Sequence, residues 1–494
     1  MIKKLANNYF WIAIVILYVF TRLINLKIMP IFTDEAIYSY WAQIALNDPA
    51  HRYISMVDGK QPLFIWLAAI MQRFIADPLI ASRLVSVMAG FTATIGIFLV
   101  AKTLFNEKIA KIAAILYVIL PFTLIYDRMA LYDSLLTAIG IYTLYLSLKL
   151  AKNPLLDIAL INGFILGLGQ ITKSSANFFL ALLPAALLLF DFNQKGASKK
   201  LLKWGYLTFT SIAISTVMYN ALRLSPLFYI IEKKNHEFIR STSDVIKNPF
   251  LHFSGNLDSI TGWFLDYNGI PFVILFCVVS IWGVYRLKKP VLILLFYILT
   301  PFTFELFFNQ VLYPRFSLFY FPYVIILVSV GMEYILSQKK PYVFFALILI
   351  LVIPLYSSFR LLSNPPKSLI TKSDKNQYLN EWPAGYGVQE VVDFLKIQAR
   401  DQNVYVGTEG TFGLLPFALQ IYFWSDNRIQ IEGYWPVNEI PQQVLDAAKT
   451  KKTYFVFNEK QNILDNPDDP HLKFIAKYQK GNGSSYMRLY EVIP

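Results

Sequence analysis

The most regular feature of this chain is a succession of long apolar segments separated by polar connections. Each is about 17 to 25 residues long, the length that an α-helix needs to cross the hydrocarbon core of a bilayer. Eleven such segments are predicted, at residues 9–28, 80–101, 109–127, 132–150, 156–172, 176–191, 204–223, 270–285, 291–309, 316–336 and 341–362. The pattern therefore predicts a multi-span α-helical membrane protein, with its membrane domain in residues 1–363.

Lysine and arginine residues concentrate in alternate connections, which indicates the cytoplasmic side of each span. These cations are Lys102, Lys108, Lys111, Lys149, Lys152, Lys195, Lys199, Lys200, Lys203, Arg286, Lys288, Lys289, Lys339 and Lys340. Lys3 and Lys4 place the N-terminus on the same side. No small-residue cleavage site follows the first apolar segment, so we expect a retained helix rather than a signal peptide.

One shorter apolar stretch, Pro62 to Ile75, does not fit this alternation, because a crossing there would place every later Lys-rich connection outside the cell. At about 14 residues it is short for a span. We therefore expect an interfacial or re-entrant helix within an external first loop at 29–79. The alternative is a helical hairpin formed by 61–76 and 80–101.

The composition changes at the linker SNPPKS, and residues 364–494 look like a soluble extracytoplasmic domain. Helices are predicted at 388–399, 414–423 and 441–450, and strands at 403–407, 429–432, 453–458, 473–478 and 486–492. Their alternation predicts a small α/β domain. The segment VGTEGTFG lacks the lysine of a nucleotide-binding loop and the spacing of a dinucleotide fingerprint, so we assign this domain no catalytic role.

Composition excludes several classes of protein. With 56% hydrophobic and only 16% charged residues, 494 residues cannot form three soluble domains. The net charge of +13 is largely a topology signal and predicts no nucleic-acid partner. The single cysteine, Cys277, permits no internal disulfide and is expected to pack within its apolar segment. The four scattered histidines have no metal-binding spacing.

Ionisable residues also collect at the external ends of the spans, where they are functional candidates. The carboxylates are Asp34, Glu35, Asp127 and Asp133, and the candidates for contacting a phosphate are Lys60, Arg83, Arg128, Lys173, Tyr313 and Arg315. Such a set suits a reaction on a lipid-linked phosphate. The cations would neutralise the leaving phosphate, and a carboxylate would take the proton of an incoming hydroxyl.

Structural explanations compete with this interpretation. Asp34 and Glu35, like Asp133, could cap a helix, and Asp127 with Arg128 could form a surface ion pair. The cations at Lys60, Arg83 and Lys173 could extend to lipid headgroups. The long external segment Leu224 to Asn268 could cover a substrate or be an ordinary solvated loop, and we favour a cover. The occurrence of all these charges on one side favours a site.

The order of several motifs resembles the integral-membrane glycosyltransferases of the GT-C fold, particularly the bacterial enzymes related to protein O-mannosyltransferases and the lipid A aminoarabinose transferase. The resemblance covers about residues 8 to 335. The motifs are TDEAIYSYWA, GKQPLFIWL, ASRLVSVMAG, RMALYDSLLTA, GLGQITKSSANFF and YPRFSLFYFPYVIIL. Two positions depart from the family pattern, because Gln61 replaces a proline and Ser174 stands where glycine is common.

The resemblance implies roles for individual residues. Asp34 matches the catalytic aspartate of the first external loop, Glu35 its acidic neighbour and Asp133 a second acidic position. Lys60 matches a lysine that contacts the lipid phosphate. Lys173 and Arg315 match further cationic positions near that phosphate. Arg83 matches the family's motifs less closely than these residues do.

The implied reaction is inverting transfer of a sugar from a polyprenyl-phosphate donor to a hydroxyl of a lipid, glycan or protein acceptor at the outer face of the plasma membrane. No cofactor is required, although a Mg or Mn ion bridging Asp34 and Asp133 is an alternative. Two other classes remain open. A flippase would need ionisable residues near the midplane, of which Glu305 is the clearest, and a non-catalytic scaffold would bind glycan through its external domain.

Overall fold

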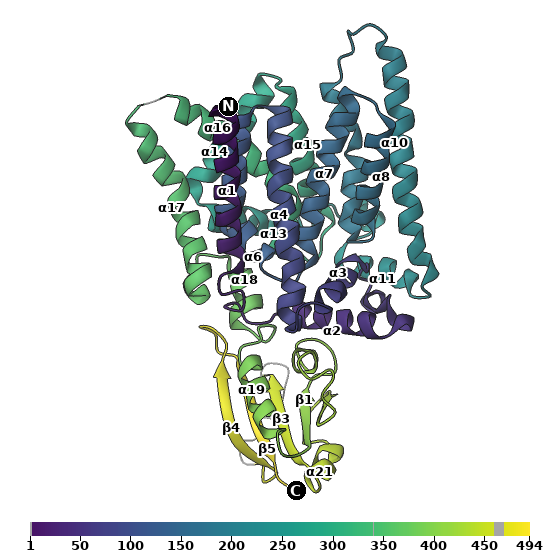
Figure 1. Ribbon diagram of the computed structural model, residues 1–494, viewed down its shortest axis with the longest axis vertical. Helices are drawn as coiled ribbons and strands as arrows, with labels where there is room; N and C mark the ends of the chain where they lie inside the picture. Colours follow the sequence, from purple (N-terminus) through teal and green to yellow (C-terminus); the bar gives the residue numbers. More distant parts are fainter. Residues whose placement is uncertain (1, 339, 459–468) are drawn as a thin grey trace.

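The computed structural model describes residues 2–338, 340–458 and 469–494, so the predicted cytoplasmic cation Lys339 lies outside the described residues. A bundle of long helices forms the larger part of the molecule, and a small sheet domain is attached to one end (Figure 1). The N-terminus lies at the opposite end of the bundle from that domain. This arrangement agrees with the predicted order of a membrane domain followed by an α/β domain.

Every predicted span coincides with a helix or a pair of consecutive helices. These are α1 (Ile2–Leu23), α4 (Pro78–Leu104), α5 (Glu107–Ile119) with α6 (Pro121–Asp127), α7 (Tyr132–Lys152), α8 (Leu156–Gln170), α9 (Asn177–Ala181) with η4 (Leu183–Leu189), α10 (Ala197–Asn220), α14 (Ile270–Tyr285), α15 (Lys289–Phe308), α16 (Phe321–Ser337) and α17 (Tyr342–Ser363). Within the described ranges, five helices are long and apolar enough to span a membrane, or seven if each of two bent pairs is one span. The count of eleven therefore stays a prediction.

Local sequence explains where several of these helices begin and bend. The side chain of Asp77 accepts a hydrogen bond from the Ile80 amide at the start of α4, and Asn106 caps α5 in the same way. Between α5 and α6 the axis bends by 60° at Pro121. Proline has no amide proton and disfavours a helical conformation in the preceding residue, so the helix breaks there.

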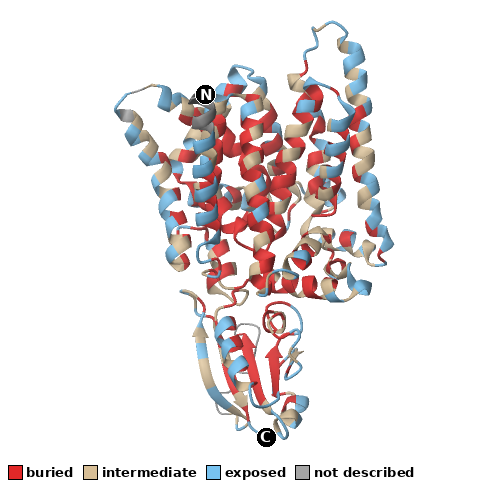
Figure 2. Cartoon of the chain, viewed as in Figure 1, coloured by how far each residue is buried: buried red, intermediate tan, exposed pale blue. Residues whose placement is uncertain are grey.

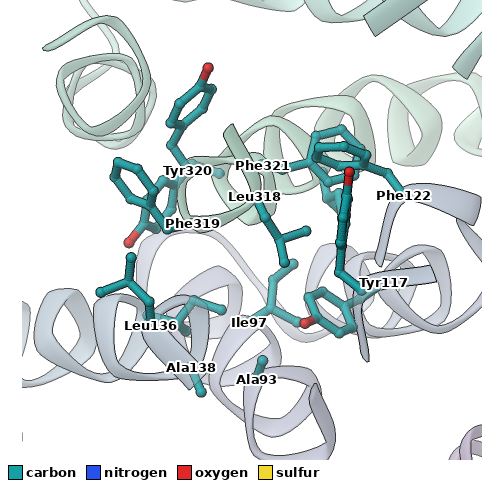
Figure 3. Packing of buried hydrophobic residues seen from close by; sticks show 14 of the residues in the cluster. Ala93, Ile97, Tyr117, Phe122, Leu136, Ala138, Leu318, Phe319, Tyr320 and Phe321 are labelled. Carbon is teal, nitrogen blue, oxygen red and sulfur yellow. The ribbon is translucent and has the colours of Figure 1, made fainter. Parts of the chain in front are cut away.

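The core of the bundle lies where α4, α5, α7 and α16 meet, and Figure 2 shows burial concentrated there. Leu318, Phe319, Tyr320 and Phe321 at the start of the α16 span pack over Ile97 and Leu136 and their neighbours (Figure 3). The outlying α17 exposes many apolar side chains, as expected for a surface that faces lipid. Cys277 is also exposed, which corrects the expectation that it packs internally.

Short helices cover the end of the bundle that faces the sheet domain. The first loop contains α2 (Thr33–Asn47) and α3 (Leu63–Gln72), and the long connection contains α11 (Phe228–Phe238) and α12 (Thr242–Lys247). Its last helix, α13 (Phe253–Asn268), lies within the bundle and forms a pair with α14 that is bent by 114° (Figure 1). At 10 residues, α3 extends only about 15 Å. That length is half of what a span needs, so it favours the interfacial helix over the hairpin.

The C-terminal domain contains a five-stranded sheet in the order β2-β1-β3-β5-β4. Its elements are α19 (Val388–Gln398), β1 (Val404–Glu409), α20 (Phe417–Gln420), β2 (Ile429–Tyr434), α21 (Gln442–Ala448), β3 (Lys452–Asn458), β4 (Leu472–Gln479) and β5 (Tyr486–Val492). β1 is parallel to β2 and β3, whereas β5 is antiparallel to β3 and β4. The predicted α/β class is confirmed.

The C-terminal chain also contacts the first external loop. Ala384 forms an isolated antiparallel bridge with Phe32, and the Gly385 amide donates to the Ile31 carbonyl at 2.8 Å. Further along α2, the Gln43 side chain donates to the Ile421 carbonyl at 2.8 Å. The residues that lead into α2 are therefore held by a segment far away in the sequence.

Candidate active site

The site begins at the N-terminus of α2, where Asp34 and Glu35 stand side by side in the chain. The helix starts at Thr33, so both residues lie in its first turn, and Glu35 Oε2 accepts a hydrogen bond from the Phe32 amide at 3.0 Å. Consecutive side chains on a helix point about 100° apart. The two carboxylates therefore face different surroundings.

Glu35 is fully buried and holds the external loop together. Its carboxylate accepts two hydrogen bonds from Arg83, at 2.7 and 2.8 Å, and one from the Ala130 amide at 2.7 Å. The same guanidinium donates to the carbonyls of Leu26, Met29 and Pro30. These contacts occupy both groups, so the geometry does not support a catalytic role for Glu35 or a phosphate contact for Arg83.

Asp34 points the other way and pairs with a cation from a distant helix. Its Oδ2 lies 2.9 Å from Nη1 of Arg315, and 24% of its side chain is exposed. The Tyr38 hydroxyl donates to the same oxygen at 3.5 Å. A second pair lies nearby, with Lys173 Nζ 2.7 Å from Asp133 Oδ1.

A cavity of about 490 Å3 opens between these groups. Among the charged and polar residues of its wall are Lys60, Gln61, Asp133, Lys173, Glu305 and Arg315. Lys234 and Phe238 of α11 form part of the wall, so the long external connection covers part of the cavity, and its role as a cover for a substrate stays a prediction. The structure thus brings Lys60, Lys173, Arg315 and Asp133 together around one cavity. Asp34 is not one of the residues that line it, but its carboxylate pairs with Arg315.

Lys60 has a different environment from the other two cations. Within the described residues no carboxylate lies within 4.0 Å of its ammonium, which instead lies 5.3 Å from the centre of the Phe238 ring. Burial lowers the pKa of Lys60, and the neighbouring charges of Arg315 and Lys173 lower it further, whereas Asp34 and Asp58 oppose this change. An anion in the cavity would relieve that electrostatic cost.

Two other residues proposed from the sequence lie outside the cavity wall. Arg128 is buried and donates to the carbonyls of Thr21, Arg22, Ile24 and Asn25, where it caps the end of α1. Tyr313 lies with its ring centre 5.4 Å from the Arg315 guanidinium carbon, so it contacts the cation rather than the cavity. Neither geometry supports direct binding of a phosphate.

Asp127 does not form the expected surface pair with Arg128. It is buried and pairs with Arg22 of α1 at 3.1 Å, while Ser134 donates to its other oxygen at 2.8 Å. The sequence contained a signal for this pair, because an arginine within an apolar segment requires an internal partner. The partner itself could not be identified without the packing of α1 against α6.

Two charged residues of the wall were not assigned to the site from the sequence. Glu305 of α15 is buried, and its Oε2 accepts a hydrogen bond from Tyr320 at 2.7 Å. Lys234 of α11 forms ion pairs with Asp58 at 3.1 Å and Glu237 at 2.9 Å. Only the folded arrangement of α11 and α15 brings these residues to Lys60 and Lys173.

The residues poorly fit a divalent cation. In the parts of the chain that the structure describes, no group of three or more His, Cys, Asp or Glu side chains could hold a metal ion. Asp34 and Asp133, the proposed bridging ligands, are paired with Arg315 and Lys173 instead. Their pairing with cations leaves Asp34 and Asp133 poorly suited to bridge a Mg or Mn ion.

Comparison with known proteins gives a partial sequence match and a broader structural one. Residues 59–220 match the family described as dolichyl-phosphate-mannose-protein mannosyltransferase. No curated protein matches the chain. ArnT from Cupriavidus metallidurans in the apo state is 12% identical, with a TM-score of 0.59 over 99% of this chain and 98% of ArnT.

Two further solved structures are similar. ArnT from the same organism bound to undecaprenyl phosphate is 13% identical, with a TM-score of 0.55 over 98% of this chain and 97% of ArnT. The oligosaccharyltransferase AglB from Archaeoglobus fulgidus, in complex with an inhibitory peptide and a dolichol-phosphate, is 12% identical, with a TM-score of 0.50 over 90% of this chain and 69% of AglB. The chain is therefore similar over residues 59–220 to the dolichyl-phosphate-mannose-protein mannosyltransferases, and over nearly its whole length it shares the fold of the integral-membrane protein ArnT.

Proposed function

We propose that the protein transfers one sugar, with inversion, from a polyprenyl-phosphate donor to a hydroxyl of a lipid, glycan or protein acceptor at the outer membrane face. The observation that carries this proposal is the charged cavity wall, where Lys60, Lys173 and Arg315 converge beside two carboxylates. Three cations around one space suit a phosphate ester, since arginine can bind it through two donors and lysine through a point charge.

Asp34 is the proposed base. The acceptor oxygen attacks the anomeric carbon of the donor, the bond from that carbon to the phosphate oxygen breaks, and the acceptor proton passes to Asp34. The polyprenyl phosphate leaves with the bonding electrons, and the cations stabilise its charge. Glu35 is unsuited to this role because Arg83 and two backbone amides occupy its carboxylate.

Arg315 connects the base to the phosphate site, because it pairs with Asp34 and also lines the cavity. A carboxylate that is paired with a guanidinium is a weaker base than a free one. When the donor phosphate binds Arg315, it competes for that guanidinium. Donor binding would therefore make Asp34 more basic before the acceptor reacts.

An apolar groove beside the cavity supports a lipid-linked donor. It has a volume of about 610 Å3 and runs along α15, where its wall includes Leu295, Leu299 and Phe307. Phe178 and Phe304 belong to the walls of both the groove and the cavity. An isoprenoid chain in the groove would bury apolar surface while its phosphate reached Lys173.

Asp34→Asn tests the proposed base. The substitution keeps the size of the side chain and removes its ability to accept the proton, so we expect transfer to fall by about 100-fold or more. Transfer is measured in vesicles supplied with a polyprenyl-phosphate sugar. Thermal unfolding in detergent shows whether the variant is folded.

Asp48→Asn is the matched control, because the half-exposed Asp48 follows α2, lies outside the cavity wall, pairs with the exposed His51 and accepts a hydrogen bond from the Ala50 amide. It should transfer sugar at the wild-type rate. Transfer by Asp34→Asn at that rate would show that another group is the base. Asp133, which lines the cavity, would then be the next residue to test.

A further inference from the structure

Lys60 and Lys173 of the cavity wall belong to two short segments, and a side-chain hydrogen bond joins these segments. Gln61 follows Lys60, Ser174 follows Lys173, and Gln61 Nε2 donates to Ser174 Oγ at 2.8 Å. Gln61 is only 3% exposed. The Leu63 amide adds a backbone hydrogen bond of 3.0 Å to the Ile171 carbonyl. The two segments are therefore in direct contact just after Lys60 and on either side of Lys173.

The hydrogen bond opposes an electrostatic repulsion. Lys60 and Lys173 carry like charges on the wall of the same cavity, and the charge of Lys173 lowers the pKa of Lys60. Asp133 partly compensates Lys173, but Lys60 has no such partner within the described residues. In the absence of an anion, moving the two ammonium groups apart would lower their electrostatic energy.

The hydrogen bond requires a side-chain donor at position 61 and a side-chain acceptor at position 174. A proline at 61 has no side-chain donor, and a glycine at 174 has no side chain. Neither could form this hydrogen bond. The bond therefore depends on the side chains of both Gln61 and Ser174.

We propose that Gln61 and Ser174 are positioning residues, which hold Lys60 and Lys173 at the separation that binds the phosphate of the polyprenyl-phosphate donor. This inference rests on the proposed function, since it concerns the same cavity. A binding site that is already arranged for its ligand loses less entropy on binding than one that must be ordered. The pair should therefore act on donor affinity more than on the chemical step.

A double-mutant cycle tests this inference with Gln61→Leu, Ser174→Ala and the combined variant. Each single substitution should raise the KM for the donor about fivefold, the equivalent of ~1 kcal/mol for one hydrogen bond, with kcat nearly unchanged. The combined variant should be no worse than either single variant, because all three lack the same bond. Ser174→Thr retains the hydroxyl, so its KM for the donor should stay close to the wild-type value, unlike that of Ser174→Ala.

Equilibrium binding of polyprenyl phosphate without a sugar provides a second measurement that does not require turnover. Its dissociation constant should rise in the same proportion as the KM. Ser175→Ala is the matched control, because it removes a hydroxyl from the same wall that has no hydrogen-bond partner among the described residues. It should change both constants less than Ser174→Ala does.

The outcomes separate this inference from the proposed function. If the wild type transfers sugar but Gln61→Leu and Ser174→Ala bind polyprenyl phosphate as tightly as the wild type, the positioning role is wrong. A loss of thermal stability with unchanged affinity would also overturn it, since the bond would then serve folding alone. If the wild type binds polyprenyl phosphate and transfers no sugar, the proposed function fails while the positioning role is still measured by binding. A wild type that binds no polyprenyl phosphate overturns both.

Discussion

Asp34 and Glu35 are adjacent in the sequence, yet their environments separate chemistry from structure. Glu35 is buried against Arg83 and two backbone amides, whereas Asp34 remains partly exposed beside Arg315. A buried carboxylate with all its acceptor sites occupied stabilises the fold and cannot readily take a proton. Two side chains that look equivalent in the sequence therefore have different roles in the folded protein.

Arg83→Met should destabilise the protein without a specific effect on donor binding. The substitution leaves the Glu35 charge buried without its cation, which costs about 3–5 kcal/mol. Thermal unfolding in detergent should show a clear decrease in the midpoint, and folded protein should retain the wild-type KM for the donor. Arg73→Met, at an exposed position, serves as the control and should unfold like the wild type.

The opposite result would restore the role expected from the sequence. If Arg83→Met kept its thermal stability but showed a raised KM for the donor, Arg83 would contact the phosphate in the working enzyme. The buried pair of Arg83 and Glu35 would then have to open during the reaction.

The sequence could indicate which residue types form the site but not which of them meet. Lys60, Lys173 and Arg315 were chosen by side and by motif, and they do line one cavity. Arg83 and Arg128 have the same charge and the same side, but backbone carbonyls surround them. Only the folded positions of those carbonyls distinguish a structural arginine from one that is free to bind a phosphate.

At the scale of elements, α11 completes the cavity and rests on a glycine in the first loop. Gly59 has a positive φ of 68°, and a Cβ atom there would lie 2.6 Å from the Lys234 Cβ. The close approach lets α11 sit directly over the segment that carries Lys60. The shape of the cavity wall thus depends on the absence of one side chain.

Gly59→Ala should move α11 away from the Lys60 segment. The strained backbone costs about 1 kcal/mol or more, and the overlap with Lys234 adds to this. We expect a lower midpoint of thermal unfolding together with a higher donor KM. Gly196→Ala is a matched control, because its φ of 77° is equally strained but nothing lies within 4 Å of the added carbon.

Both variants should therefore lose stability through backbone strain, and only Gly59→Ala should change the KM. An unchanged donor KM in a folded Gly59→Ala protein would mean that the position of α11 does not affect the cavity.

Hydropathy predicted the positions of the elements well, because long apolar runs and caps are local properties. It predicted poorly where polar segments fold back on the bundle. The external connection Leu224 to Asn268 appeared as a loop, yet it forms α11, α12 and α13. Contacts such as the hydrogen bond from the Arg240 amide to the Phe308 carbonyl stabilise this arrangement, and sequence periodicity does not reveal such tertiary contacts.

At the scale of the whole molecule, a buried carboxyl lies where the membrane domain meets the linker to the sheet domain. Asp374 accepts hydrogen bonds from Tyr126 of α6, at 2.6 Å, and from Tyr267 of α13. Burial raises the pKa of Asp374 to about 6, although the two tyrosines and the charge of Arg315 lower it. The folded protein therefore binds a proton here more tightly than the unfolded chain does.

This shift predicts a pH dependence of stability. Because the pKa of Asp374 is higher in the folded protein, protonation of this carboxyl adds to the free energy of unfolding. That contribution is fully present below the unfolded pKa of about 3.9 and is lost as the pH rises through the folded pKa of about 6. Asp374→Asn should abolish the part of the pH dependence that falls between about pH 4 and 6, as measured by unfolding at a series of pH values. Its size is roughly 3 kcal/mol at most.

Asp401→Asn is the control for this experiment, because Asp401 is an exposed carboxylate of the sheet domain. It should retain the wild-type dependence. If Asp374→Asn also retained it, the proton uptake would belong to another group.

The bridge between Phe32 and Ala384 has a consequence for how the enzyme is made. Thr33 binds the Pro383 carbonyl through both its amide and its hydroxyl, and these partners are 350 positions apart in the chain. A ribosome must therefore synthesise the whole membrane domain and the linker to the sheet domain before the segment ahead of Asp34 contacts its partner. A nascent chain that stopped before Pro383 could insert its helices and would still lack this contact. The segment that carries the proposed base thus reaches its final setting late in biosynthesis, after residue 383 has been made.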